Sequence, residues 1–170
     1  MLEILALIFL SGGSTHVSQT FEQAGQVTFI VPQGWSVERR EKGPFLKRFL
    51  KNPDQSQSCD IVVVGGACAQ DTSEIQNFLS QAREMWVGRA EKPAELKTPI
   101  AHFEGFMIQG AKALEPFGKA GEPTTEVYAA CVGKDLVSAQ FTTFAAHPKR
   151  DALRQQCIAV IQSISSPKKR

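Results

Sequence analysis

Residues 27–39 read VTFIVPQGWSVER and contain the clearest fold signal in the chain. The five residues at each end favour a strand, whereas Pro32 and Gly34 interrupt the pattern. Proline cannot donate a hydrogen bond to a sheet ladder, and glycine tolerates the positive φ that a tight turn requires. The stretch therefore predicts a strand over residues 27–31, a chain reversal, and a second strand over residues 35–39, anchored on the core by the large ring of Trp35.

Similar patterns of apolar residues and turn residues predict the other strands and two helices. Further strands are predicted at residues 45–50, 59–64, 105–114, 125–132 and 136–145, and the last two form a hairpin around Gly133. Helical spacing of apolar residues predicts a first helix, which a loop containing Pro93 and Pro99 ends, and a second helix that starts at Pro148. The two stripes are Ile75, Phe78, Leu79, Ala82 and Trp86, and Leu153, Cys157, Val160, Ile161 and Ile164.

The order of these elements predicts the fold class. It reads β-β-β-β-α-β-β-β-α, with short strand connections and no alternation of single strands and helices. We expect a single-domain α+β sandwich, in which two helices cover one side of a mainly antiparallel sheet of about six to seven strands. Such a scaffold would be a rigid platform.

The ends of the chain differ from its middle. Residues 4–10, ILALIFL, are an apolar run followed by small and polar residues, as in a secretory signal, although Glu3 stands where a positive charge is usual. The run is too short for a membrane span, which needs about 20 apolar residues. We expect residues 1–20 to be a signal peptide or a disordered segment, residues 21–165 the sandwich, and residues 166–170 a basic tail. The alternative is that residues 4–10 form a strand or helix on the fold.

Composition excludes several classes of protein. The 170 residues carry 19 basic and 17 acidic side chains, which is too balanced for a protein that binds nucleic acid through net charge. The four cysteines form no C-x-x-C pair and have no histidine at metal-binding spacing. We therefore expect no metal site, no other cofactor, no nucleic-acid partner and no integral membrane span.

Two stretches resemble a known family. The first is VTFIVPQGWSV, which is similar to the F-x-V-P-x-G-W motif at the start of the PsbP-like superfamily. The second is TEVYAACVGKDLVSAQFTTFA followed by a helix ending IAVIQSI, which resembles the C-terminal part of that superfamily. The superfamily also includes DcrB-like envelope proteins and Ran-binding nuclear import factors of yeast. The resemblance covers roughly residues 27–165. It implies a protein-binding or accessory role, as in photosystem assembly, small-GTPase binding, envelope function or chaperoning of type VI secretion effectors.

Candidate catalytic residues are few. Of the three histidines, only His102 lies near a sheet entry, where Cys68 could approach it as a nucleophile. The carboxylates Asp60, Asp71, Glu74 and Glu104 show no spacing that selects a pair for glycoside cleavage. We expect no catalytic residues, and a Cys68/His102 pair is the sharpest enzymatic alternative.

The cysteines allow more than one disulfide. Cys131 lies in a predicted strand and Cys157 on the helix that should cover the sheet, so these two could bond. Cys59 and Cys68 bracket a strand and its exit, and would meet only if the chain folds back after Gly65 and Gly66. If the protein is exported, at least one bond is expected; otherwise Cys131 and Cys157 are small buried apolar residues.

The leading hypothesis is an exported, periplasmic or secreted, bacterial protein without enzymatic activity that binds another protein. It could be an envelope accessory protein, or an immunity or inhibitor protein for a toxin. The candidate contact is the connection at residues 115–123, with Glu115, Phe117 and Lys119. One alternative is a cytosolic adaptor that chaperones a type VI secretion effector, which requires four reduced thiols. Another is a small thiol-dependent enzyme acting through Cys68.

Overall fold

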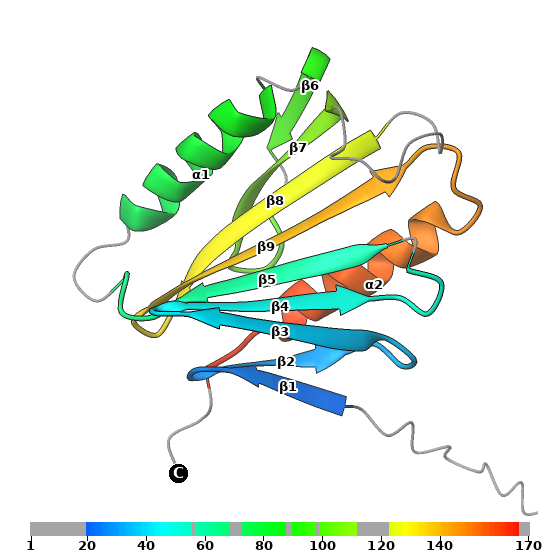
Figure 1. The fold of residues 1–170 in the computed structure, drawn as a ribbon. Helices are drawn as coiled ribbons and strands as arrows, with labels where there is room; N and C mark the ends of the chain where they lie inside the picture. Colours follow the sequence, from blue (N-terminus) through cyan, green and yellow to red (C-terminus); the bar gives the residue numbers. More distant parts are fainter. Residues whose placement is uncertain are drawn as a thin grey trace, which may run out of the picture.

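The computed structural model describes residues 20–55, 57–68, 73–87, 90–97, 99–111 and 123–166. Nine strands and two helices follow one another in this part of the chain (Figure 1). They are β1 (Thr20–Ala24), β2 (Val27–Val31), β3 (Ser36–Lys42), β4 (Phe45–Lys51), β5 (Ser58–Val64), α1 (Ser73–Val87), β6 (Ala90–Lys97), β7 (Glu104–Ala111), β8 (Pro123–Val132), β9 (Asp135–Phe144) and α2 (Arg150–Ser163).

Seven strands form one sheet in the order β3-β4-β5-β9-β8-β7-β6, and every neighbouring pair is antiparallel. β1 and β2 form a separate antiparallel pair. The predicted fold class, an α+β sandwich of a mainly antiparallel sheet and two helices, is confirmed. The predicted hairpin of β8 and β9 is also confirmed, with Val132 opposite Asp135 and Gly133 at a φ of 64° in the turn.

The two helices lie on opposite faces of the large sheet (Figure 1). Along β8, Tyr128 and Ala130 share a core cluster with α2, whereas Val127 and Ala129 share clusters with α1. Successive side chains of a strand point to opposite faces, so the two clusters are separated by the sheet. The expectation that both helices cover one side is therefore wrong. An apolar stripe indicates that a helix packs on the sheet, but it does not indicate on which of the two sheet faces the helix lies.

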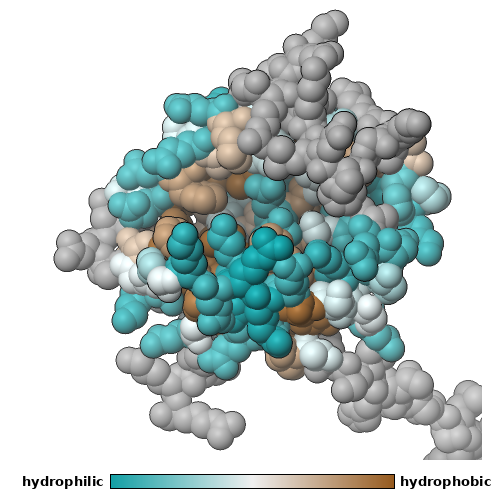
Figure 2. All heavy atoms as spheres, in the orientation of Figure 1, coloured by the Kyte–Doolittle hydropathy of each residue, from teal (hydrophilic) through white to brown (hydrophobic). Residues whose placement is uncertain are grey.

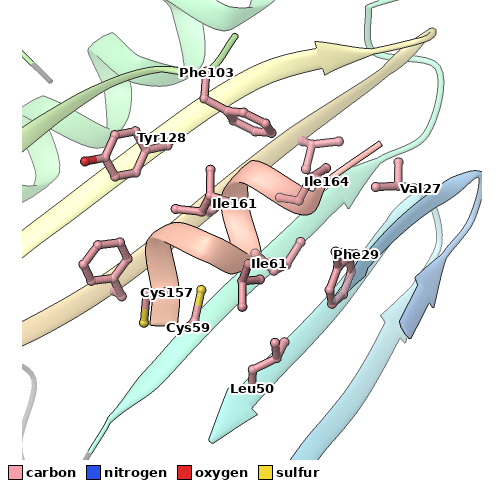
Figure 3. Close-up of a cluster of buried hydrophobic side chains, with 14 of the residues drawn as sticks. Val27, Phe29, Leu50, Cys59, Ile61, Phe103, Tyr128, Cys157, Ile161 and Ile164 are labelled. Carbon is pink, nitrogen blue, oxygen red and sulfur yellow. The ribbon is translucent and has the colours of Figure 1, made fainter. Parts of the chain in front are cut away.

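The main core lies between the sheet, α2 and the β1–β2 pair. Figure 3 shows Phe29 of β2, Ile61 of β5 and Ile161 of α2 converging there, and none of the three is exposed to solvent. β8 and most of β9 are buried on both faces, whereas β5 alternates between buried and partly exposed residues. The sheet is thus covered on both faces at its centre, and on only one face at β5.

The proline-glycine stretch forms the predicted turn but joins different sheets. Gly34 has a φ of 79°, and the Trp35 N–H donates to the Pro32 carbonyl at 3.1 Å. Trp35 is 8% exposed within the main core, as predicted. The strands on either side do not pair, because β2 pairs with β1 and β3 pairs with β4. The turn therefore carries the chain from the small sheet to the edge of the large one.

Two strands, β1 and β6, were not predicted from the sequence. β1 lies in a stretch that reads as polar, and its side chains at Thr20, Phe21 and Gln23 are exposed. β6 lies where a loop was predicted, because the stretch contains Pro93. β6 is an edge strand whose register with β7 shifts between Ala90 and Ala94, and a proline is tolerated at such an edge irregularity.

Ion pairs and backbone bonds attach the β1–β2 pair to the rest of the fold. Glu22 of β1 accepts hydrogen bonds from Arg39 of β3 at 2.7 and 2.6 Å and from Arg48 of β4 at 3.0 Å. The hydrogen bonds from Arg39, helped by Arg48, hold the pKa of Glu22 below its ordinary value. On the other side, the backbones of Thr28 and Ser165 exchange hydrogen bonds of 2.9 and 3.0 Å.

Candidate functional site

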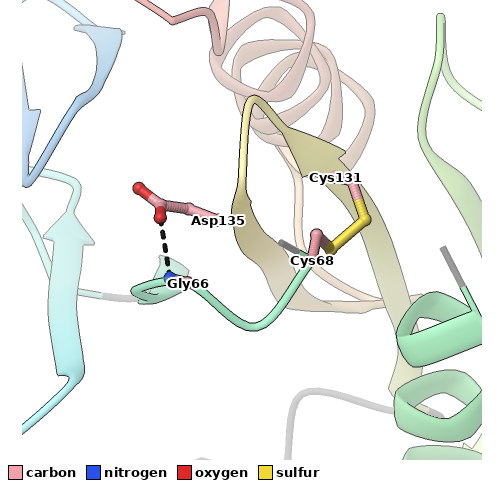
Figure 4. Close-up of a disulfide and its surroundings, with 4 residues drawn as sticks. All are labelled: Gly66, Cys68, Cys131 and Asp135. Atoms are coloured by element: carbon pink, nitrogen blue, oxygen red, sulfur yellow. Dashed lines mark hydrogen bonds between the residues drawn. A yellow bond between two sulfur atoms is a disulfide. The ribbon is translucent and has the colours of Figure 1, made fainter. Parts of the chain in front are cut away.

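The structure pairs the cysteines differently from the prediction. Cys68 and Cys131 form a disulfide with a Cα–Cα distance of 5.8 Å, and Cys59 and Cys157 are free and buried (Figure 4). The Cys131–Cys157 pairing is wrong because Cys131 lies on the α1 face of the sheet and Cys157 lies in the core on the other face. The bond joins the segment after β5 to β8. In the same place, Asp135 accepts a hydrogen bond from the Gly66 N–H at 2.9 Å.

The structure does not support a Cys68 nucleophile. Its sulfur is bonded to Cys131, so it offers no thiolate. The ring of His102 lies against Phe103, with 4.7 Å between the centroids. The alternative Cys68/His102 pair is therefore wrong. The predicted contact residues Glu115, Phe117 and Lys119 lie outside the described residues.

Part of the large sheet has one face without a helix over most of its width, which we call the open face. It comprises the outward side chains of three strands on the side of the sheet that carries α1. α1 packs mainly against β6, β7 and β8, and Val64 at the end of β5 joins its apolar cluster. The members are Ser36, Glu38, Arg40 and Lys42 of β3, Phe45, Lys47, Phe49 and Lys51 of β4, and Ser58, Asp60, Val62 and Val64 of β5.

Figure 2 shows hydrophilic atoms gathered over these strands, with hydrophobic atoms at their margins. Phe45 is 45% exposed. A hollow of about 430 Å³ lies beside it, lined by Arg40, Glu41, Lys42, Phe45 and Lys47. An apolar ring next to cations therefore borders a concave surface.

The charges of the open face are ordered by an ion-pair network. Glu38 accepts from Arg40 at 2.6 Å and from Lys51 at 2.8 Å, and the Arg40 guanidinium lies 4.9 Å from the centroid of the Phe49 ring. Among the described residues, no carboxylate pairs with Lys42 or Lys47. Four cations thus face two carboxyl groups, those of Glu38 and Asp60, so the open face is basic on balance.

Asp60 lies on the strand of this face that borders β9, between Phe49 of β4 and Gln140 of β9 in the register. Burial raises the pKa of its carboxyl group from 3.8 to about 6, against the opposing effects of a hydrogen bond with Ser58 and of the nearby Lys51 and Arg40. Its Oδ1 atom is buried and has no hydrogen-bond partner in the described structure. The carboxyl group is therefore neutral in mild acid and charged at neutral pH.

A second polar cluster lies on the opposite face of the sheet. Glu126 of β8 is fully buried, and it accepts hydrogen bonds from Arg154 of α2 at 2.6 and 3.0 Å and from the Tyr128 hydroxyl at 2.6 Å. A hollow of about 270 Å³ opens beside it. The carboxylate is satisfied by these donors, so the cluster fixes α2 on the sheet.

Sequence reasoning missed the open face, although a signal for it is present. In FLKRFLK, residues 45–51, Phe45, Lys47, Phe49 and Lys51 alternate with more buried positions. This alternation predicts one wet face, but aromatic rings on that face cannot be told from core residues until the register is known.

The described residues contain no group of histidine, cysteine or acidic side chains placed to hold a metal ion. Neither α1 nor α2, the helices in the described ranges, is both long enough and apolar enough to cross a membrane.

Comparison with known proteins shows similarity of fold. No protein-family model and no curated protein matches the sequence. A crystal structure from Bacteroides thetaiotaomicron VPI-5482 is similar with a TM-score of 0.52 at 13% identity, covering 85% of this chain and 46% of that one. This chain therefore spans about half the length of that protein.

Two further solved structures are similar over most of both chains. Cyanobacterial PsbP (CyanoP) from Synechocystis sp. PCC 6803 has a TM-score of 0.49 at 9% identity, over 91% of this chain and 96% of that one. LpqN, involved in cell envelope biogenesis of Mycobacterium tuberculosis, has a TM-score of 0.49 at 13% identity, over 89% and 92%. The similar structures thus include a PsbP protein, as the sequence resemblance predicted, and the likeness concerns the fold alone.

Proposed function

We propose that this protein is a binding module without enzymatic activity, and that its open face binds an acidic segment of another protein. The observation that carries the proposal is the exposed, basic sheet face with Phe45 beside a hollow. Arginine and aromatic side chains are enriched at the centres of protein interfaces. Phe45 adds one exposed apolar contact beside these charges.

Charge complementarity selects the kind of partner. Lys42 and Lys47 are exposed, and among the described residues they have no counter-ion. A partner that presents carboxylates to them and an apolar side chain to Phe45 would satisfy both features of the face. The internal network of Glu38, Arg40 and Lys51 favours a protein over a nucleic acid, because a carboxylate within the face would repel phosphates.

The binding test uses a labelled synthetic peptide in which glutamate and leucine alternate, followed by fluorescence anisotropy. The double variant Lys42→Glu/Lys47→Glu should weaken binding by about tenfold or more, since each lost charge pair costs part of the 1.4 kcal/mol that a factor of ten represents. The control Lys149→Glu/Arg150→Glu changes the net charge equally at exposed sites at the start of α2, on the opposite face of the sheet, and should change affinity less than about threefold.

Equal losses in the two variants would contradict the proposed site, and so would the absence of binding at low salt. Tighter binding of single-stranded DNA than of the peptide would assign the face to nucleic acid instead. Phe45→Ala tests the apolar contact at constant charge. Phe117→Ala, measured in the same way, tests the connection with Glu115, Phe117 and Lys119, which remains a proposed second contact.

We further propose export from a bacterial cytoplasm, with an envelope accessory role or a toxin-immunity role. Support comes from the Cys68–Cys131 disulfide, because such bonds persist in oxidising compartments. The alternative cytosolic chaperone needs four reduced thiols and is disfavoured by the same bond. N-terminal sequencing of protein from fractionated cells should give a mature start within residues 13–23 in the envelope fraction. Protein that retains Met1 in the cytosolic fraction would contradict export.

A further inference from the structure

Two buried cysteines from distant parts of the sequence lie together in the main core. Cys59 belongs to β5 and Cys157 to α2, and neither is exposed to solvent. Figure 3 shows their sulfur atoms next to each other, between the strand and the helix. The hydrogen bond with Cys157, together with burial, raises the pKa of the Cys59 thiol well above its ordinary value. The Cys59 thiol is therefore protonated, and both sulfur atoms are shielded from solvent in the folded protein.

The sheet separates this pair from the existing disulfide. Cys68 and Cys131 are bonded on the α1 face, whereas Cys59 and Cys157 lie on the α2 face. Four cysteines allow three ways of forming two disulfides. The other two ways would each require bonds through the sheet. The fold thus leaves one partner for Cys59, and it is already adjacent.

We propose that Cys59 and Cys157 form a second disulfide that ties α2 to β5 when the chain folds in the presence of a disulfide donor. One cysteine thiolate attacks a sulfur of the donor disulfide and releases one donor thiolate. The second cysteine thiolate then attacks the mixed disulfide and releases the other. The two cysteines are oxidised, the donor is reduced to two thiols, and the two cysteine protons end on those thiols.

The burial of the pair determines when this reaction can occur. Only a thiolate attacks a disulfide, and the donor must reach it. Both conditions hold while the chain is still folding, and both fail once α2 covers β5. The bond is therefore made during folding or after α2 detaches, and the folded reduced pair resists oxidation. This inference is independent of the proposed binding function.

The test compares two preparations of the full chain, both unfolded and reduced first. One is refolded with a mixture of oxidised and reduced glutathione, and the other is folded first and given the same mixture afterwards. Peptide mapping by mass spectrometry without reduction should find Cys59 linked to Cys157 in the first preparation. In the second, the same link should form at least about tenfold more slowly, at the rate at which α2 opens.

Two results would overturn the proposal. One is that Cys59 and Cys157 remain alkylatable after refolding in glutathione while Cys68–Cys131 forms. The other is that either residue links to Cys68 or Cys131 in the refolded, monomeric protein. Thermal unfolding gives a second measurement, because the form with two disulfides should melt roughly 10 °C above the form with Cys68–Cys131 alone. A lower melting temperature for the form with two bonds would contradict a clamp that fits the native fold.

Discussion

Asp60 carries a carboxyl group that burial has removed from most of its hydration. The group is mostly buried on β5 in the open face, its Oδ1 atom lacks a partner in the described structure, and its pKa is raised to about 6. The groups that face it are Ser58 on its own strand, Lys51 of β4, and Arg40 and Glu38 of β3. Their combined effect does not offset the loss of hydration, so the charged form is costly.

This raised pKa predicts a dependence of stability on pH. An acid whose pKa is higher in the folded state binds its proton more tightly there, so folding stability falls as pH rises from about 4 to about 6. A difference of about 2 pKa units corresponds to about 2 to 3 kcal/mol. Asp60→Asn should therefore be more stable than the wild type at pH 7.5, and the difference should shrink toward pH 5.

Urea unfolding of both proteins at pH 5, 6 and 7.5 measures this difference. Glu22 does not interfere with this measurement. Because its pKa is lowered in the folded protein, its contribution to folding stability is lost only as the pH falls below 4.5, the ordinary pKa of the group. A constant difference between Asp60→Asn and the wild type over this range would show that the carboxyl group is charged throughout. At the residue scale, the sequence placed Asp60 on the correct face of its strand with Val62 and Val64, but could not say that the face was open.

At the scale of elements, one ion pair fixes α2 on the sheet. Glu126 is fully buried, and Arg154 is its only cationic partner among the described residues. Arg154→Met should destabilise the fold by about 3 kcal/mol, since a buried carboxylate would be left with the Tyr128 hydroxyl alone. Urea unfolding at pH 7.5 measures the loss.

The double variant Glu126→Gln/Arg154→Met is the control for this pair. It removes the buried charge as well as its partner and should recover a substantial part of the lost stability. A loss below about 1 kcal/mol in Arg154→Met would mean that the pair behaves like a surface salt bridge. The same comparison separates the contribution of the charge pair from the contribution of apolar packing under α2.

The elements were predictable where local pattern and final environment agree. β2 was predicted with its observed bounds and β5 within one residue, and the predicted stripe of the first helix falls within α1, because their apolar periodicity reflects real burial. β1 and β6 were missed for different reasons. β1 has few apolar residues to reveal it, and β6 accommodates Pro93 at an irregular sheet edge, which only the three-dimensional pairing shows.

At the scale of the whole molecule, the class of fold followed from the order of elements, but the placement of layers did not. Two apolar stripes are equally compatible with helices on one face and with helices on both. The actual arrangement leaves β3, β4 and most of β5 without a helix on one side. It also explains the cysteine pairing, because the sheet lies between the two pairs of sulfur atoms. Neither result can be read from spacing along the chain.

The central claim is that this uncovered face binds an acidic protein segment, and a backbone amide NMR titration tests it most directly. The ¹⁵N-labelled protein is titrated with the glutamate-leucine peptide, and the shifted amides are mapped on the fold. We predict that the shifts concentrate on β3, β4 and β5, around Phe45 and Lys47, and that they diminish in Lys42→Glu/Lys47→Glu. Shifts centred on α2 or α1, or no shifts at saturating peptide, would contradict the account.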